Sequence, residues 1–117
     1  MKHTVTLKQN HEFRRLYNKG KSAVSPFFAI YSRKTGRPYS RLGITTGVKL
    51  GNAVKRNFVR RRIRELYRTN EEAFLPGYDI VVVARTRAIV GSYADLEHSF
   101  LQSMKKLGLS AGKEDKL

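Results

Sequence analysis

The residues best suited to chemistry in this sequence are the arginines and lysines crowded into residues 49–68. This twenty-residue stretch holds eight cations against one acid, Glu65, and so carries seven of the formal net charge of +15. Guanidinium groups make paired hydrogen bonds to phosphate and stack on bases, whereas a dense like-charged surface repels itself unless a polyanion lies against it. These residue types therefore favour binding to a polyphosphate, and nucleic acid is the expected partner.

The spacing of these cations predicts an amphipathic helix, with one polar side and one apolar side. At about 100° per residue, one arc of the helix is polar and consists of Arg56, Asn57, Arg60, Arg61, Arg64 and Arg68. The opposite arc is apolar and consists of Val59, Ile63, Leu66 and Tyr67. Most charged helix faces are simply solvated, but they mix signs, whereas like charges at i,i+4 spacing lower helix stability unless an anion neutralises them. We therefore favour contact with nucleic acid over a solvated face.

The elements predicted around the basic helix favour RNA over DNA. A helix-turn-helix protein needs a second short helix packed across the recognition helix. Here the segments before and after the basic helix in the sequence are predicted to be strands instead, so major-groove recognition by that motif is not expected.

Carboxylates and histidines are scattered along the chain rather than clustered. The nine acids fall in separate elements, and His3, His11 and His98 show no metal-ligand spacing. A protein nuclease usually holds its metal ions on clustered carboxylates, and no glycine-rich phosphate loop is present. We therefore expect no catalytic residue and no metal site in the polypeptide, which should be inert by itself.

Length and composition are those of one small domain spanning residues 1–117. The hydrophobic fraction of 40% is enough for a modest core, and the absence of cysteine excludes disulfides and cysteine-ligated zinc. The longest apolar run, Ile80–Ala84, is far too short to span a bilayer, and no signal peptide is recognised at the N-terminus. We expect a cytoplasmic protein that does not act at a membrane and needs no obligate protein partner.

The order of the predicted elements is α-β-β-α-β-α in one α+β unit. Asn10, Asn52 and Ser92 are the expected N-caps of the three helices, and Gly20 and Gly108 end the first and last of them. The expected ranges are a helix over 11–18, strands over 25–33 and 41–48, the basic helix to about 69, a buried strand over 78–84, and a last helix that follows Ser92. Residues 1–9 are expected to form a mobile arm and residues 110–117 a disordered polar tail.

Three segments together resemble the protein subunit of bacterial ribonuclease P. They are Arg41-Leu-Gly-Ile-Thr, the stretch from Lys49 to Glu65 with its pattern Asn-Ala-Val-x-Arg-Asn-x-x-Arg-Arg-x-x-Arg, and Asp79-Ile-Val-Val-Val-Ala-Arg. The resemblance covers about residues 7–107, and the central pattern is long and specific. It implies a compact sandwich like that of a ribosomal protein domain, with a left-handed β-α-β crossover where handedness rules favour the opposite hand.

The resemblance also implies an activity. In this family the holoenzyme removes the 5′ leader of precursor tRNA by hydrolysing a phosphodiester bond. A large RNA subunit performs the chemistry with Mg²⁺ bound mainly by RNA and substrate, and the protein binds that RNA and the leader. Carried over by motif, the residues expected to bind the RNA subunit are Lys49, Asn52, Lys55, Arg56, Asn57, Arg60, Arg61, Arg64 and Arg68.

The leader is expected to lie between the first helix and the sheet. The residues that match the leader-binding positions of the family are Phe13, Tyr17, Ala29 and Tyr31. Exposed rings on a sheet can stack with unpaired bases, although an aromatic pair at helical spacing is more often simple core. Tyr17 departs from the phenylalanine of relatives, and its hydroxyl adds a hydrogen-bonding group.

Two other functions remain open at the level of sequence. A structural ribosomal protein that binds folded ribosomal RNA would have similar charge, size and fold class. A protein nuclease would cleave RNA without an RNA subunit. Stimulation of precursor-tRNA cleavage by the RNA subunit at low Mg²⁺ would separate the first hypothesis from both.

Overall fold

The computed structural model describes residues 1–110, which form one five-stranded sheet with helices on both faces. The elements are β1 Thr4–Thr6, α1 Asn10–Lys19, β2 Lys21–Val24, β3 Phe28–Lys34, β4 Ser40–Thr45, the 3₁₀ turn η1 Val48–Leu50, α2 Ala53–Asn70, the 3₁₀ turn η2 Glu71–Ala73, β5 Tyr78–Ala84, α3 Arg87–Val90 and α4 Tyr93–Lys106. The predicted α+β class is confirmed.

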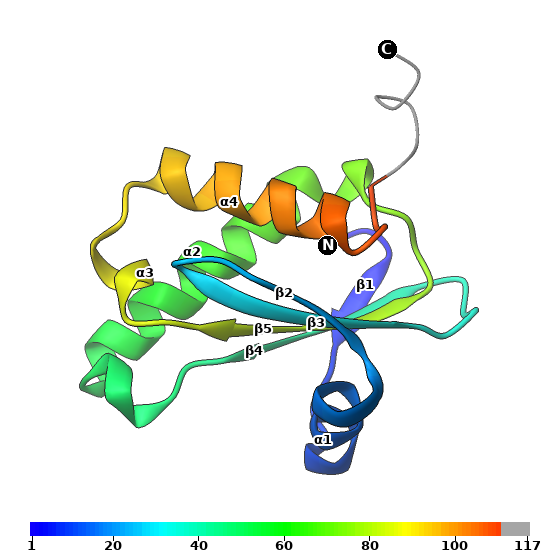
Figure 1. Ribbon diagram of the computed structural model, residues 1–117, viewed down its shortest axis with the longest axis horizontal. Coiled ribbons are helices and arrows are strands. Elements are labelled where there is room, and N and C mark those ends of the chain that lie inside the picture. The colour runs from blue at the N-terminus through cyan, green and yellow to red at the C-terminus, as the bar shows by residue number, and fades with distance from the viewer. Residues whose placement is uncertain (111–117) are drawn as a thin grey trace.

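The strand order in the sheet is β1-β4-β5-β3-β2. β4 pairs in parallel with both β1 and β5, whereas β3 runs antiparallel to β5 and to β2. Because β4 and β5 are parallel neighbours, α2 is the crossover between them. Figure 1 shows α2 and α4 above the sheet and α1 below it.

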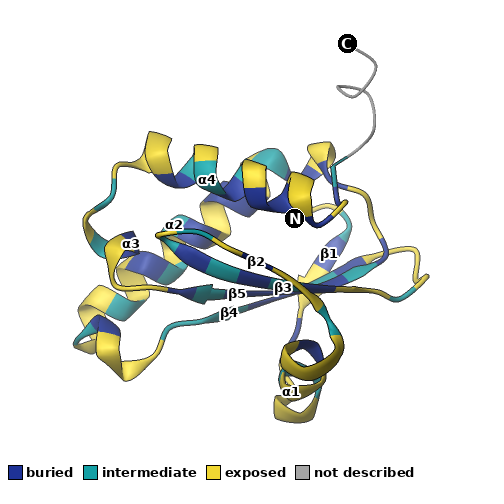
Figure 2. Cartoon of the chain, viewed as in Figure 1, coloured by how far each residue is buried: buried dark blue, intermediate teal, exposed yellow. Residues whose placement is uncertain are grey.

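Two apolar clusters hold these layers together. The larger one lies between the sheet and the helices α2 and α4, where Phe100 packs against Phe28, Tyr67 and Phe74 with ring centroids 5.9, 6.5 and 5.9 Å apart. The smaller one lies beneath α1 and includes Leu16. The central strands β3, β4 and β5 contain most of the buried strand residues, whereas β1, β2 and the outer sides of α1 and α4 are largely exposed (Figure 2).

The central strand β5 confirms the prediction from its β-branched run. Ile80 and Val82 belong to the larger cluster, whereas Val81 packs under α1 in the smaller one. A strand covered on both faces has no solvated side, so its sequence does not alternate with polar residues.

Capping was predicted correctly at two of three helices. The side chain of Asn52 accepts a hydrogen bond from the Lys55 backbone N–H at 3.0 Å, and Ser92 Oγ accepts from the Asp95 N–H at 3.1 Å. The prediction for the first helix was wrong by one residue: Gln9 is its N-cap, without a side-chain bond, and Asn10 is already helical.

The N-terminal segment corrects the predicted element order, which has no element before the first helix. Thr4–Thr6 form a strand paired with β4, and the buried carboxylate of Glu71 holds the residues around it. Glu71 accepts hydrogen bonds from the backbone N–H groups of Lys2 and His3 at 2.7 and 3.1 Å and from Thr4 Oγ1 at 2.6 Å. A three-residue strand is too short to show alternation, so nothing local in the sequence marks it.

Other short elements were missed for the same reason. β2 has four residues, of which only Ala23 is buried, and α3 is one turn long. At the other end of the chain, Ser110 forms an isolated β-bridge with Phe74. The rest of the predicted tail lies outside the described residues.

Glu71 is expected to make stability depend on pH. Burial raises the pKa of its carboxyl group, but the hydrogen bonds from Thr4, Lys2 and His3 outweigh burial and hold the pKa below its ordinary value of 4.5. The stabilisation is therefore present above pH 4.5 and is lost as pH falls through the folded-state pKa. We expect Glu71→Gln to lower the free energy of unfolding by about 2 kcal/mol near neutral pH and by less in acid, as measured by urea unfolding.

The matched control for this variant is Glu72→Gln. Glu72 is exposed, and its ion pair with Lys2 lies in solvent, so little change in stability is expected. Equal losses from the two variants, or a loss at Glu71 that does not depend on pH, would contradict the role given to Glu71.

Candidate nucleic-acid interface

The apolar arc of α2 fixes which way its arginines point. Val59, Ile63 and Leu66 are 0% exposed and Tyr67 is 1% exposed, all in the larger core cluster. Since this side of α2 is held against the sheet and α4, the polar arc can only face outward. The division predicted from the spacing of these residues is confirmed.

The entry to α2 is held by a tight turn. Gly51 has φ of 117°, a conformation that side-chain-bearing residues rarely adopt. The Asn52 cap follows it, and Arg56 Nη1 donates to the Gly51 carbonyl oxygen at 2.8 Å. The preceding 3₁₀ turn places Lys49 beside this entry. The start of α2 is therefore built by residues from the predicted RNA-binding group.

The nine residues of that group do not have equal freedom to bind an anion. The side chains of Lys49, Lys55, Arg61 and Arg64 make no hydrogen bond or ion pair with any group among residues 1–110, although the backbone N–H of Lys55 donates to the Asn52 cap. Arg60 donates to Thr46 Oγ1 at 2.6 Å and to Asn57 Oδ1 at 3.2 Å, which orients its guanidinium without neutralising it.

Arg68 is the exception within the group. Its Nε donates to Glu65 Oε1 at 3.0 Å, and a second bond joins the same two side chains. This ion pair raises the pKa of Arg68 and lowers that of Glu65. Arg68 is therefore already paired with an anion, which makes it the weakest candidate for a phosphate contact.

Arg62 lies outside the predicted group and has a different task. Its guanidinium carbon is 5.0 Å from the centroid of the Phe58 ring, and Nη1 donates to the Ala88 carbonyl oxygen at 3.3 Å. Arg62 therefore connects α2 to α3.

The opposite face of the sheet carries α1, and a partly buried ion pair holds it there. Arg41 on β4 donates to both carboxylate oxygens of Asp79 on β5 at 2.8 and 2.7 Å, and its Nη1 lies 2.7 Å from Glu12 Oε2 on α1. The hydrogen bonds to Asp79, aided by those to Glu12, raise the pKa of Arg41 despite its partial burial. Charge-assisted bidentate bonds of this kind fix direction as well as position.

Close packing then positions the two aromatic residues of α1. The Phe13 ring lies directly on Gly43, where an added Cβ would be 2.6 Å from the ring. Tyr17 meets Tyr31 edge to face with centroids 5.0 Å apart, and its hydroxyl lies 3.3 Å from Thr45 Oγ1. Tyr17 is exposed, whereas Phe13 and Tyr31 are half-buried and pack against the smaller core cluster.

The predicted leader-binding residues are thus brought together on one face of the sheet. Ala29 and Tyr31 project from alternate positions of β3, and Ala29 pairs with Val83 of β5, which pairs in turn with Thr45. We call Phe13, Tyr17, Ala29 and Tyr31 the aromatic trough. Sequence reasoning missed Val83 and Thr45, because only the strand register shows that they continue its floor.

A hollow of about 580 Å³ extends from this floor toward the start of α2. Its wall includes Lys49 and Arg85, together with Thr45 and Val83 of the floor. Lys49 therefore connects the cationic face of α2 with the end of the trough, a proximity that its place in the sequence does not reveal.

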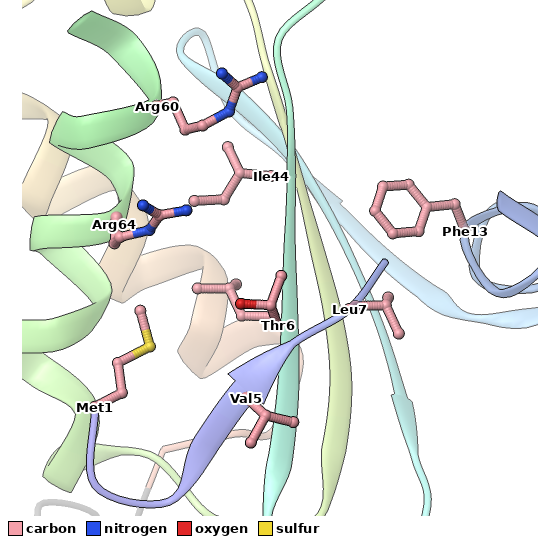
Figure 3. A pocket seen from close by; sticks show the side chains of 9 residues that line it. Met1, Val5, Thr6, Leu7, Phe13, Ile44, Arg60 and Arg64 are labelled. Carbon is pink, nitrogen blue, oxygen red and sulfur yellow. The ribbon is translucent and has the colours of Figure 1, made fainter. Parts of the chain in front are cut away.

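A second, smaller cavity of about 150 Å³ also lies between the two predicted groups. Arg60 and Arg64 border it on one side and Phe13 on the other (Figure 3). Its apolar lining includes Val5, Leu42 and Ile44. The predicted RNA-binding and leader-binding residues therefore meet around β4.

Within the described part of the chain, no group of three or more histidine, aspartate or glutamate side chains could hold a metal ion. Among residues 1–110 there is also no helix of the length and apolarity that a membrane crossing requires.

Known proteins match nearly the whole chain. A family model described as Ribonuclease P matches residues 1–108. The Ribonuclease P protein component of Clostridioides difficile (strain 630) is 40% identical over 108 residues, which are 92% of this chain and 95% of the relative. The structure of the Staphylococcus aureus RNase P protein matches with a TM-score of 0.81 at 33% identity and covers 91% of this chain and 97% of its own. The RNase P protein from Thermotoga maritima has a TM-score of 0.76 at 32% identity, with coverages of 83% and 92%.

The contact between Phe13 and Gly43 can be tested directly. In Gly43→Ala the new methyl group would overlap the Phe13 ring, so α1 or the ring must shift. We expect a loss of about 1–3 kcal/mol in the free energy of unfolding, measured by denaturant titration, and displaced NMR signals of the Phe13 ring. The control is Gly47→Ala, where an added Cβ meets nothing within 4 Å. A loss no larger than in the control would mean that Phe13 does not rest on Gly43.

Proposed function

Because the chain belongs to the ribonuclease P protein family, we propose that it binds the RNA subunit along α2 and the 5′ leader of precursor tRNA in the aromatic trough. Membership makes it a protein component of an endoribonuclease whose partner is the ribonuclease P RNA. What is proposed is which surface binds which RNA: α2 binds the RNA subunit, and the aromatic trough binds the leader.

The observation that carries the proposal is the rigid cationic face of α2. Its backbone is held by four fully buried side chains and a capped first turn, so the positions from which the arginine side chains project stay at fixed spacing. A row of cations on a preformed helix loses little backbone entropy when it meets a phosphate backbone. Lys49, Lys55 and Arg61 flank the row and extend its reach.

The trough suits an unpaired strand. Tyr17 and Tyr31 present ring faces and edges above a floor of small and β-branched side chains, and Ala29 leaves space beside them. Bases without partners stack on such rings with little sequence preference. The Tyr17 hydroxyl, which lies near Thr45, offers a hydrogen bond to a base or phosphate that phenylalanine would lack.

The protein is assigned a positioning role and the RNA subunit the hydrolysis. Three carboxylates that are at least partly buried already have partners within the protein. Glu12 and Asp79 bind Arg41, and Glu71 binds the N-terminal segment. Mg²⁺ would be bound mainly by the RNA subunit and the substrate. The cations of α2 would reduce repulsion between phosphates, so that substrate and Mg²⁺ bind the RNA more tightly. We propose that the protein carries out this task in the cytoplasm together with its RNAs.

The function can be tested with the purified protein and ribonuclease P RNA. We expect the protein to raise precursor-tRNA cleavage at low Mg²⁺ and to cleave nothing without the RNA. Arg60→Ala combined with Arg64→Ala should weaken assembly and make the slope of log K against log salt shallower by roughly 1.5. Filter binding across a salt series measures the slope. The control is Lys105→Ala with Lys106→Ala, which removes two exposed cations of α4 and should leave the slope nearly unchanged.

Phe13→Ala tests the trough separately. It should leave assembly with the RNA subunit intact but reduce about tenfold the affinity advantage of leader-bearing over mature tRNA, as expected for the loss of one stacking ring. Phe13→Leu keeps most of the packing on Gly43 and should show the same selective loss if stacking is the cause. If the arginine and Phe13 variants impaired both steps equally, the division into two surfaces would be wrong.

A further inference from the structure

The cavity between β1, β4 and α2 has a feature that neither proposed surface uses. β1 is short, and its ladder with β4 ends where the Leu7 N–H donates to the Leu42 carbonyl oxygen at 2.9 Å. β4 continues to Thr45, so within residues 1–110 no strand lies beside its outer edge beyond Leu42. Figure 3 shows this edge between the two arginines and Phe13.

Ile44 presents a free donor and a free acceptor at that edge. Ser40 and Leu42 direct their backbone groups toward β1, because Ser40 N–H donates to the His3 carbonyl oxygen and Leu42 accepts from Leu7. Backbone direction alternates along a strand, so Ile44 points the same way. No backbone or side-chain group among residues 1–110 bonds to it there, and Ile44 lines the cavity.

The cavity has the size of one six-membered ring. Its volume is about 150 Å³, which in an apolar protein cavity is enough for benzene. Val5, Leu42, Ile44 and Met1 provide the apolar lining. Two fused rings need more space than this. A flat single ring with polar atoms on one edge would fill the cavity and pair with the Ile44 backbone.

The mouth of the cavity is cationic. Arg60 and Arg64 lie one helical turn apart on α2 and both border the opening. Arg60 is held there by Thr46, and Arg64 has no partner among the described side chains. A phosphate attached to the buried ring would meet both guanidinium groups.

We infer that this cavity binds one unstacked pyrimidine nucleotide of RNA, with the base against the Ile44 backbone and the phosphate on Arg60 and Arg64. Uracil and cytosine each carry a donor beside an acceptor on the edge that would face Ile44. The inference rests on the proposed function only in taking the nucleotide from a bound RNA. It adds a base-sized site to surfaces that otherwise contact phosphates and stack bases without selection.

The test uses the full chain and mononucleotides, observed through the backbone amide signal of Ile44 by NMR. We expect uridine 5′-monophosphate and cytidine 5′-monophosphate to shift this signal saturably. Adenosine 5′-monophosphate should bind about tenfold more weakly there, because its base does not fit. Ribose 5-phosphate should shift the guanidinium signals of Arg60 and Arg64 but not the Ile44 amide.

A variant that fills the cavity separates base binding from phosphate binding. Thr6 lies at the cavity edge on β1 and is exposed, so Thr6→Phe places a ring in the space without removing a cation. It should abolish the Ile44 response to uridine 5′-monophosphate and keep the response of the arginines to ribose 5-phosphate. Val90→Phe, which adds a ring at a residue 83% exposed on α3, is the control and should change neither.

The outcomes distinguish this inference from the proposed function. Equal Ile44 shifts with ribose 5-phosphate and uridine 5′-monophosphate, or adenosine 5′-monophosphate binding as tightly, would overturn the pyrimidine site even if the protein stimulates cleavage. Selective pyrimidine binding that Thr6→Phe removes would support the site even if the ribonuclease P RNA were not bound. A Thr6→Phe protein that still shows the full Ile44 response to uridine 5′-monophosphate would also refute the site.

Discussion

Burial of one side of α2 is the constraint on which the rest of the structure depends. Val59, Ile63, Leu66 and Tyr67 are almost completely removed from solvent, and burying each such side chain contributes about 1.5–3 kcal/mol. A like-charged i,i+4 pair on the other side costs about 0.2–0.5 kcal/mol. Packing therefore outweighs the repulsion along the arginine row, and the helix can hold charges that would destabilise it alone. Tyr67 also holds the N-terminal strand β1 to α2, because its hydroxyl lies 2.9 Å from Thr4 Oγ1.

The sheet places the two proposed surfaces at a fixed separation. Leu42 and Ile44 of β4 lie on the side of α2, while Arg41, Gly43 and Thr45 lie on the side of α1. One six-residue strand therefore contacts both the cationic face and the aromatic trough. Since β4 is also paired with β5, in which five of the seven residues are buried, neither surface can move far without disturbing the core. An RNA subunit bound on one side and a leader bound on the other would be held at a defined distance and orientation relative to each other.

Because β1 is short, part of the edge of β4 stays open to a binding partner. An uncovered strand edge is usually a liability, because it can pair with another chain. Here the open part of β4 is bordered by Arg60 and Arg64, which would repel another copy of this basic protein and attract a polyanion. The same two cations that belong to the proposed RNA-binding face thus protect the edge. A nucleotide base at Ile44 would satisfy the backbone groups that β1 leaves unpaired.

Local sequence determined the features that depend on neighbours along the chain. The 3.6-residue period of residues 53–70, the caps at Asn52 and Ser92 and the β-branched run of β5 could be recognised because each arises within a few residues. The short strands β1 and β2 could not, since their hydrogen bonds come from partners elsewhere in the sheet. The candidate residues on α2 and in the trough were recognised as separate groups. Only the tertiary structure decided that Phe13, Ile44 and Arg64 surround one cavity, because distances between residues far apart in sequence are set by strand register and core packing.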